Sequence, residues 1–354
     1  MTGGEGAELD VGGVGAGERA AGAGGGGAAP GEEVAGAGRR GPAGLDVERL
    51  RRGGIVLPFV ALFIVLAITS SSFATSTNLL NILDQQSATL IIAAAGTLVL
   101  VSGGIDLSVG AVYTLGSVVA GELALHMASG PAIVIGIIAG LVIGLANGVI
   151  STVFRINSLI ATLAMSFVVA GLASLITGGN LVVLFTHPGF GQLARTNFLT
   201  VHTSIWIMVV VVIALGLFLA RTTTGRYMYA TGGNREAARI AGVRINWVRV
   251  LSFTLSGGMS ALAGIIDASR VLSAQSTDQS ALTFTVLAGI VVGGTSILGG
   301  EGAVWRTVVG VLFIALIGNG YDLLGLDPLY EQITLGVIMI LAVGIDAWSR
   351  GRVG

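Results

Sequence analysis

The sequence predicts an all-α integral membrane protein with about ten transmembrane helices and with both termini in the cytoplasm. Three observations predict this class: 53% of the 354 residues are hydrophobic, only 10% are charged, and the mean hydropathy is +0.89. Because an ordinary soluble domain has roughly 25% charged residues, this composition excludes a soluble enzyme. The net charge of -1 gives no basic footprint for nucleic acid.

The N-terminal tract differs in composition from the rest of the chain. Residues 1–50 are rich in glycine and alanine and poor in large apolar side chains, so we expect a disordered cytoplasmic tail. No compact apolar stretch directly follows a basic start, which argues against a signal peptide. The tract ends in arginines, Arg39, Arg40, Arg49, Arg51 and Arg52, next to the first long apolar run. Basic clusters stay on the cytoplasmic side, so the N-terminus is expected inside.

Long apolar stretches follow from Ile55 to the C-terminus. Each has about 17 to 22 residues, the length that a helix needs to cross roughly 30 Å of hydrocarbon. We expect spans near residues 55–74, 86–102, 107–127, 131–151, 157–177, 203–220, 250–269, 282–298, 303–324 and 329–348. Between the second and third spans, Gly-Gly-Ile-Asp-Leu-Ser is compatible with a turn or with a break within the membrane.

The arginines agree with this count of spans. With the N-terminus inside, ten crossings put Arg155, the loop from Arg221 to Arg249 and the C-terminal arginines in the cytoplasm. Only Arg195 and Arg270 fall outside, as the positive-inside rule requires. A count wrong by one would put either the basic loop or the basic tail on the wrong face. We therefore expect a multi-pass protein of the bacterial cytoplasmic membrane.

Two residue types are missing from the sequence. Without cysteine there is no disulfide framework, thiolate metal site or thiol nucleophile. All eighteen basic residues are arginine, so no phosphate-binding loop ending in Gly-Lys-Ser/Thr and no Schiff-base lysine can be present. The chain is thus expected to hold no catalytic residues, metal or cofactor, and any nucleotide chemistry that drives it must come from another subunit.

The segment from Arg221 to Arg249 contains a short predicted helix. We expect Gly232 and Gly233 to break the chain and Asn234 to be the N-cap, with Glu236 in the first turn, where the helix dipole favours a negative charge. The small residues Ala237, Ala238, Ile240 and Ala241 follow, and Gly242 ends the helix. Such a helix can dock closely into a groove on another protein.

These residues resemble a known family. Glu236-Ala237-Ala238, followed by three residues and then Gly242, resembles the Glu-Ala-Ala loop of membrane subunits of ATP-binding-cassette importers. The wider match is closer to ribose-type monosaccharide permeases of the branched-chain amino acid/sugar permease family. The matching blocks are Gly103-Gly104-Ile105-Asp106-Leu107-Ser108-Val109-Gly110, Ile160-Ala161-Thr162-Leu163, Thr224-Gly225-Arg226-Tyr227, Gly232-Gly233-Asn234, Ala263-Gly264-Ile265-Ile266, Ser273-Ala274-Gln275, Gly293-Gly294-Thr295-Ser296 and Gly299-Gly300. They cover about residues 55 to 350 in order.

The resemblance implies a permease domain over residues 51–354 that works with partners. In such importers two permease subunits form the path, two ATPase subunits bind the cytoplasmic loops, and an extracytoplasmic binding protein delivers the sugar. Residues 221–249 would be the ATPase-coupling loop, with contacts from Gly233, Asn234, Glu236, Ala237, Ala238 and Gly242. A monosaccharide or similar small polyol is the implied substrate, and a homodimer is expected. A solvated loop that serves only topology is the alternative for this segment.

Polar residues within the spans are candidates for the translocation path. A carboxylate near the bilayer centre costs about 2.5 to 3.5 kcal/mol, so Asp106 should face a partner or water. With Ser108 it either shapes the path or caps the helix expected to begin at Leu107. Asn147, Asn157 and Asn319 either line the path or join helices by hydrogen bonds.

Two other functions remain open on the sequence alone. One is an ion-coupled secondary transporter that uses Asp106 as a proton or sodium site. The other is a membrane enzyme, against which no paired acid and base, Ser/His arrangement or metal cluster is evident at membrane depth. The arginine-rich loop favours the ATP-driven importer over both.

Overall fold

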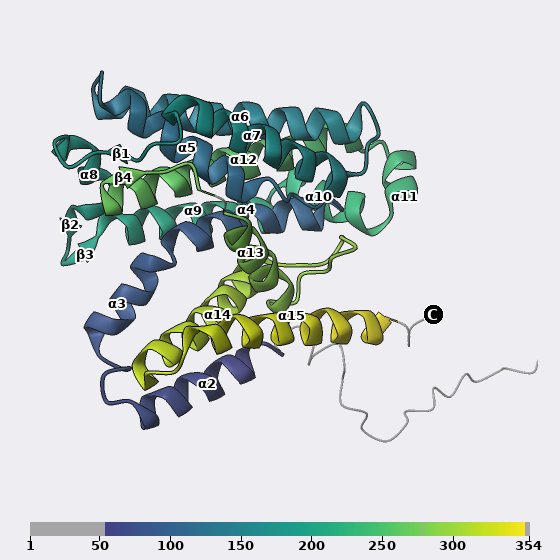
Figure 1. Cartoon of the computed structure of the whole chain (residues 1–354). Helices are drawn as coiled ribbons and strands as arrows, with labels where there is room; N and C mark the ends of the chain where they lie inside the picture. Colours follow the sequence, from purple (N-terminus) through teal and green to yellow (C-terminus); the bar gives the residue numbers. More distant parts are fainter. Residues whose placement is uncertain (1–53, 278, 351–354) are drawn as a thin grey trace, which may run out of the picture. The chain divides into compact units, whose positions relative to one another are not determined.

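A computed structural model describes residues 54–277 and 279–350, so the predicted tail over residues 1–50 lies outside the described residues. The described chain is mostly helical. Its helices are α2 (Val56–Thr69), α3 (Ser76–Gln85), α4 (Ser87–Val101), α5 (Val109–Ala124), α6 (Ser129–Thr152), α7 (Ser158–Thr177), α8 (Pro188–Arg195), α9 (Thr203–Arg221), α10 (Thr223–Gly233), α11 (Arg235–Ile240), α12 (Ile245–Val271), α13 (Ser280–Val292), α14 (Val304–Leu324) and α15 (Pro328–Arg350) (Figure 1).

Every predicted span coincides with an apolar helix, but the helices differ in length. Five of the described helices, α6, α7, α9, α12 and α14, are long and apolar enough to cross a membrane, and α3 with α4 passes the same test as a pair bent by 51°. Apolar helices of 10–17 residues occupy the remaining positions: α2, α5, α13 and residues Leu329–Leu341 of α15. The multi-pass helical class is therefore confirmed, while the count of ten crossings and the side of the termini stay predictions.

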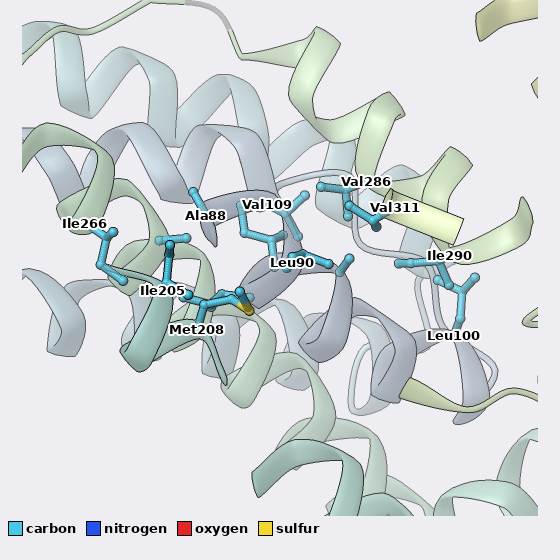
Figure 2. Close-up of a cluster of buried hydrophobic side chains, with 14 of the residues drawn as sticks. Ala88, Leu90, Leu100, Val109, Ile205, Met208, Ile266, Val286, Ile290 and Val311 are labelled. Carbon is cyan, nitrogen blue, oxygen red and sulfur yellow. The ribbon is translucent and has the colours of Figure 1, made fainter. Parts of the chain in front are cut away.

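Helix α4 lies at the centre of the packing. All fifteen of its residues, from Ser87 to Val101, are buried, as expected for a helix that is apolar on every side. Figure 2 shows Ala88, Leu90 and Leu100 of α4 among buried side chains of neighbouring helices, which come from α5, α9, α12, α13 and α14. A membrane helix enclosed by protein can act as a fixed frame for the segments around it.

Helices α6 and α12 pack closely through small residues. A Cβ atom on Gly140 would overlap the Ala261 side chain and lie 2.5 Å from the carbonyl oxygen of Gly257, and one on Gly136 would lie 2.9 Å from Ile265 Cδ1. A Cβ on Gly144 would overlap the carbonyl oxygen of Phe253. The four-residue spacing of these glycines thus serves close helix packing, as the small-residue rule for membranes predicts.

Short strands and a small helix lie together at one end of α12. Strand β1 (Val182–Val183) pairs antiparallel with β4 (Ser273–Ala274), and β2 (Asn197–Phe198) pairs with β3 (Val201–His202). Ser269 of α12 donates to the carbonyl oxygen of Phe190 in α8 at 2.7 Å. The predicted all-α class therefore needs a small correction: the loops at this end contain two sheets of two-residue strands.

Candidate functional site

Three glycine-bearing segments meet at the opposite end of the bundle: residues 101–104 after α4, the last turn of α10, and the loop 293–303. The amide of Gly300 donates to the carbonyl oxygen of Val101 at 2.9 Å. A Cβ on Gly232 would overlap this same oxygen and lie 2.5 Å from the nitrogen of Gly300. Glycine is required here because backbone approaches backbone, and α10 is thereby held between the two loops.

Residues 221–249 are more helical than the sequence suggested. The prediction that Gly232 and Gly233 break the chain is wrong, since both continue α10, and the helix ends only at Asn234. The close approach of Gly232 to its neighbours outweighs the low helix propensity of glycine. Tyr229 in the same helix donates to the carbonyl oxygen of Gly302 at 2.8 Å, which ties α10 to the loop 293–303.

The predicted short helix is confirmed as α11. Asn234 is its N-cap, and its Oδ1 accepts from the amide of Ala237 at 2.9 Å. The chain leaves the helix at Gly242, whose φ of +81° is a conformation that L side chains rarely adopt. Of the six residues predicted to couple the chain to an ATPase, five are exposed: Gly233, Asn234, Glu236, Ala237 and Gly242. The sixth, Ala238, is buried. The structure thus gathers the six residues into one compact projection.

Glu236 and Arg239 form an ion pair on the outside of α11. The Arg239 Nε atom donates to Glu236 Oε2 at 3.1 Å, one turn away along the helix. This hydrogen bond lowers the pKa of the Glu236 carboxyl below its usual value and raises the pKa of Arg239. Both side chains are well exposed, so the pair fixes the two charges in place and contributes little to the stability of the fold.

Asp106 lies in a buried polar network in the irregular segment between α4 and α5. Its Oδ1 accepts from the amide and the hydroxyl of Ser108, at 3.0 and 2.6 Å, and its Oδ2 accepts from the Ser256 hydroxyl at 2.9 Å. Asn147 Nδ2 donates to the Ser108 hydroxyl oxygen at 2.8 Å. The structure therefore brings Asp106, Ser108 and Asn147 together, with Ser256 of α12 as a partner that was not singled out from the sequence.

The helix after this network begins later than predicted. Helix α5 starts at Val109, with Ser108 at the N-cap position, so Asp106 bonds the turn that precedes the helix. The segment has a turn at residues 102–103 and no regular secondary structure over 104–108, and α7 holds it from one side. The amides of Ile105 and Leu107 donate to the hydroxyls of Ser158 and Thr162, at 3.1 and 2.9 Å.

The other two predicted path residues lie apart from the network. Asn157 is the N-cap of α7, where its Oδ1 accepts from the amide of Leu159 at 2.9 Å. Asn319 of α14 forms a reciprocal amide pair with Asn78 of α3, with both hydrogen bonds at 3.0 Å. Asn319 therefore joins two helices, as the sequence offered in the alternative to a place on the path, whereas the Asn157 bond lies within its own helix.

A basic cleft of about 910 Å³ opens beside α11. Four segments line it: the turn after α4, the connection from α6 to α7, the helix α11, and the start of α12 with the residues before it. The predicted residues Asn157 and Glu236 both line this cleft, as does Gly103. Its charged residues are Arg155, Arg235, Glu236, Arg239, Arg244 and Arg249. The positive charge that the sequence distributes over two loops is thus concentrated at one site.

A second cavity of about 580 Å³ lies between α5, α7 and the start of α13. Hydroxyl and amide side chains line it together with two aromatic rings, Phe167 and Phe284, which are 73% and 53% exposed. The polar lining residues are Thr114, Ser166, Ser276, Thr277, Gln279, Ser280 and Thr283. Sequence reasoning missed this cavity, because the residues come from three distant stretches and none of them is charged.

Two further polar pairs lie toward the strand end of the bundle. Asp267 and Arg270 form a partly buried ion pair, and Tyr113 donates to Asp267 at 2.6 Å. Glu122 Oε1 lies 3.9 Å from Nε2 of His126, which follows one helical turn later, just after α5 ends. Among residues 54–277 and 279–350, no group of three or more potential ligands is suited to a metal ion.

Comparisons with known proteins agree on one kind of protein. The family model described as branched-chain amino acid transport system / permease component matches residues 78–343. The ribose import permease protein of Escherichia coli (strain K12) is 37% identical over 294 residues, covering 81% of this chain and 92% of that protein. Its counterpart in Bacillus subtilis (strain 168) is 40% identical over 294 residues, with 82% and 91% covered.

A permease named for another pentose is also similar to the chain. The L-arabinose ABC transporter permease protein of Azospirillum brasilense is 34% identical over 309 residues, covering 86% of this chain and 90% of that protein. No solved structure is significantly similar to the chain.

Proposed function

The chain belongs to the family of permease components of branched-chain amino acid transport systems, and on that premise we propose that it is the membrane-spanning subunit of an ATP-driven importer of a monosaccharide or similar small polyol. The observation that carries this proposal is the similarity to ribose and arabinose permeases over at least nine-tenths of their length. A separate ATPase subunit would hydrolyse ATP, which suits a sequence without the lysine of a phosphate-binding loop. An extracytoplasmic binding protein would deliver the sugar.

We propose ten crossings with both termini in the cytoplasm. The five long helices, the bent pair and the four shorter apolar helices supply ten crossings in the order that the sequence predicted. Helices α5 and α13 are about 24 and 20 Å long, less than the roughly 30 Å of hydrocarbon, so the irregular segments before them must complete their spans. The arginines of the basic cleft mark the cytoplasmic end.

The projection around α11 is the proposed contact with the ATPase. Its support is geometric: backbone contacts hold α10 against the end of α4 and the loop 293–303, so a push on α11 would reach the transmembrane helices as a rigid-body displacement. Exposed Ile240 supplies an apolar contact beside the Glu236–Arg239 pair.

A matched pair of glycine variants tests this contact. Gly242 and Gly179 have nearly the same φ, +81° and +78°, and each has open space where a Cβ would stand, but Gly179 follows α7 at the other end of the bundle. We expect Gly242→Leu to abolish ATP-driven uptake with the protein still inserted, and Gly179→Leu to retain it. Equal uptake by both variants would contradict the proposed contact between α11 and the ATPase.

We propose that the translocation path connects the two cavities. The segment 103–107 separates them, since Gly103 lines the basic cleft and Leu107 lines the second cavity. Asp106, Ser108 and Asn147 would shape the gate by holding this segment, with Asn157 at the cytoplasmic mouth. Asn319 would support the path from α14 through its pair with Asn78.

A second copy of the chain would close the path. Helix α7 buries only 22% of its apolar window, and the cavity with Phe167 and Phe284 opens along it, so the wall is incomplete in one chain. We expect Phe167→Ala to lower the uptake rate, because aromatic rings and hydroxyls together suit the apolar faces and hydroxyl groups of a sugar. Ile138→Ala, at an exposed apolar residue of α6, is the control. An equal loss of uptake rate in both variants would show that the path does not pass through this cavity.

A further inference from the structure

We propose that the basic cleft beside α11 binds a phosphate-type oxyanion, either a soluble phosphate or the headgroup of an anionic phospholipid. This site is distinct from the proposed sugar-binding cavity, and it shares Arg235, Glu236 and Arg239 with the projection around α11. Five arginines and a single carboxylate are its charged lining residues among the described part of the chain. The carboxylate, Glu236, is already bonded to Arg239. Within residues 54–277 and 279–350, the cleft therefore has an excess of positive charge that its one carboxylate does not neutralise.

Arg249 is the residue that points most directly to a ligand. It lines the cleft, only 7% of it is exposed, and its Nε has no hydrogen-bond partner within the residues that the structure describes. Its Nη2 makes one long contact, 3.4 Å, to the carbonyl oxygen of Gly103. Burying a guanidinium without an anion is costly, so a bound oxyanion would satisfy a donor that is otherwise left without an acceptor.

The arrangement suits phosphate chemistry. Guanidinium groups present forked donors that match the oxygens of a phosphate, and Arg155, Arg235 and Arg249 approach from three separate segments, as recognition of a tetrahedral anion requires. Hydroxyl groups of Ser151, Thr152 and Ser158 add polar surface in the same cleft. A volume of about 910 Å³ has room for a phosphate ester or a headgroup as well as inorganic phosphate.

Occupancy of this site would act on the moving parts. The cleft is bounded by α11 on one side and by Gly103 of the gate segment on another. An anion bound to Arg235 and Arg249 would therefore join the coupling projection to α12 and stabilise one arrangement of the cytoplasmic end. Binding itself requires neither ATPase nor sugar, so it can be measured on the isolated permease.

The test uses the full chain in phosphatidylcholine nanodiscs with inorganic phosphate as the probe. We expect phosphate to raise the thermal unfolding midpoint with saturation, and chloride at equal ionic strength to leave it unchanged. Arg249→Gln should weaken phosphate binding at least about tenfold, because a hydrogen bond between charged groups is lost. Arg226→Gln removes the same charge at an exposed position of α10 outside the cleft, and this variant should bind phosphate as tightly as the natural chain does.

Nanodiscs of a second lipid composition identify the source of the anion, and a second cleft variant replaces Arg249→Gln if that variant does not fold. If a lipid headgroup is the ligand, nanodiscs containing phosphatidylglycerol should stabilise the natural chain, but not Arg249→Gln, and should reduce the added effect of phosphate. Arg235→Gln, at an exposed position of α11, repeats the test should Arg249→Gln fail to fold. The proposal is overturned if the cleft variants and Arg226→Gln respond alike, or if the cleft variants lose only the affinity for the ATPase, which would assign the cleft to acidic side chains of that partner.

Discussion

Asp106 has hydrogen-bond partners both in its own segment and on α12, while its place on the translocation path stays a prediction. Its carboxylate bonds the turn before α5, as a capping residue would, and also reaches Ser256 on α12. The sequence indicated that a carboxylate in a membrane span must have partners, but only the structure identifies them. A stripe of serines on α12, Ser252, Ser256 and Ser260, recurs every four residues and was the available signal.

Replacing Asp106 tests how much this network contributes to the free energy of unfolding. Asp106→Ala leaves buried donors of Ser108 and Ser256 without their acceptor, so we expect the free energy of unfolding to fall by roughly 2 to 4 kcal/mol. Asn157→Ala removes a single exposed cap bond and should cost about 1 kcal/mol. Unfolding in mixed micelles measures both, and equal losses would show that the Asp106 network stabilises the fold no more than a single cap bond does.

The Glu236 carboxyl gives α11 a defined pH dependence. Its pKa in the folded chain lies below the usual 4.5 because Arg239 donates to it. The contribution of this bond is thus fully present above pH 4.5 and is lost as the pH falls through the lower folded value. We expect hydrogen exchange in α11, corrected for intrinsic rates, to accelerate only in that acidic window. Glu236→Gln should show no such step, and a step near neutral pH would contradict the assignment.

At the scale of elements, local signals predicted α11 well and α10 poorly. An N-cap asparagine and a terminating glycine act within a few residues, so Asn234 and Gly242 could be assigned from the sequence alone. Gly232 and Gly233 serve contacts with Val101 and Gly300, which are far away in sequence. The predicted span 282–298 was also too long, since α13 ends at Val292. The cavity beside Phe167 could not be predicted, because long-range packing creates it.

The packing of α6 on α12 can be tested with a pair of glycines. Gly140→Ala introduces a methyl group that overlaps Ala261, so we expect a loss of about 1 to 3 kcal/mol in the free energy of unfolding. Gly171→Ala, on α7, meets no atom within 4 Å and should be neutral or slightly stabilising. Unfolding in mixed micelles distinguishes the two, and a harmless Gly140→Ala would contradict the close helix contact.

At the scale of the whole molecule, charge and hydropathy predicted the membrane class. They do not fix the number of crossings, because four of the described apolar helices are too short to span the membrane by themselves. The absence of cysteine from the sequence makes the topology directly measurable. We expect Leu199→Cys, in the loop between β2 and β3, to react with a membrane-impermeant maleimide in intact cells. Ile240→Cys in α11 should react only after lysis. Labelling of both from the outside would overturn the proposed orientation.

The dependence on partners separates an importer subunit from an ion-coupled transporter. Buried Asp106 accepts three hydrogen bonds from the chain, which explains its presence in a span without a transported ion. Uptake by the assembled importer should therefore stop on ATP depletion and survive an uncoupler.

Accumulation of the transported monosaccharide by proteoliposomes tests the central claim most directly. In vesicles that hold the permease alone, with ATP sealed inside and an ion gradient imposed, the internal sugar concentration should never exceed the external one. Vesicles that also carry the ATPase on the inside and receive the binding protein outside should accumulate the sugar only when ATP is present. Uphill accumulation by the permease alone would contradict the account.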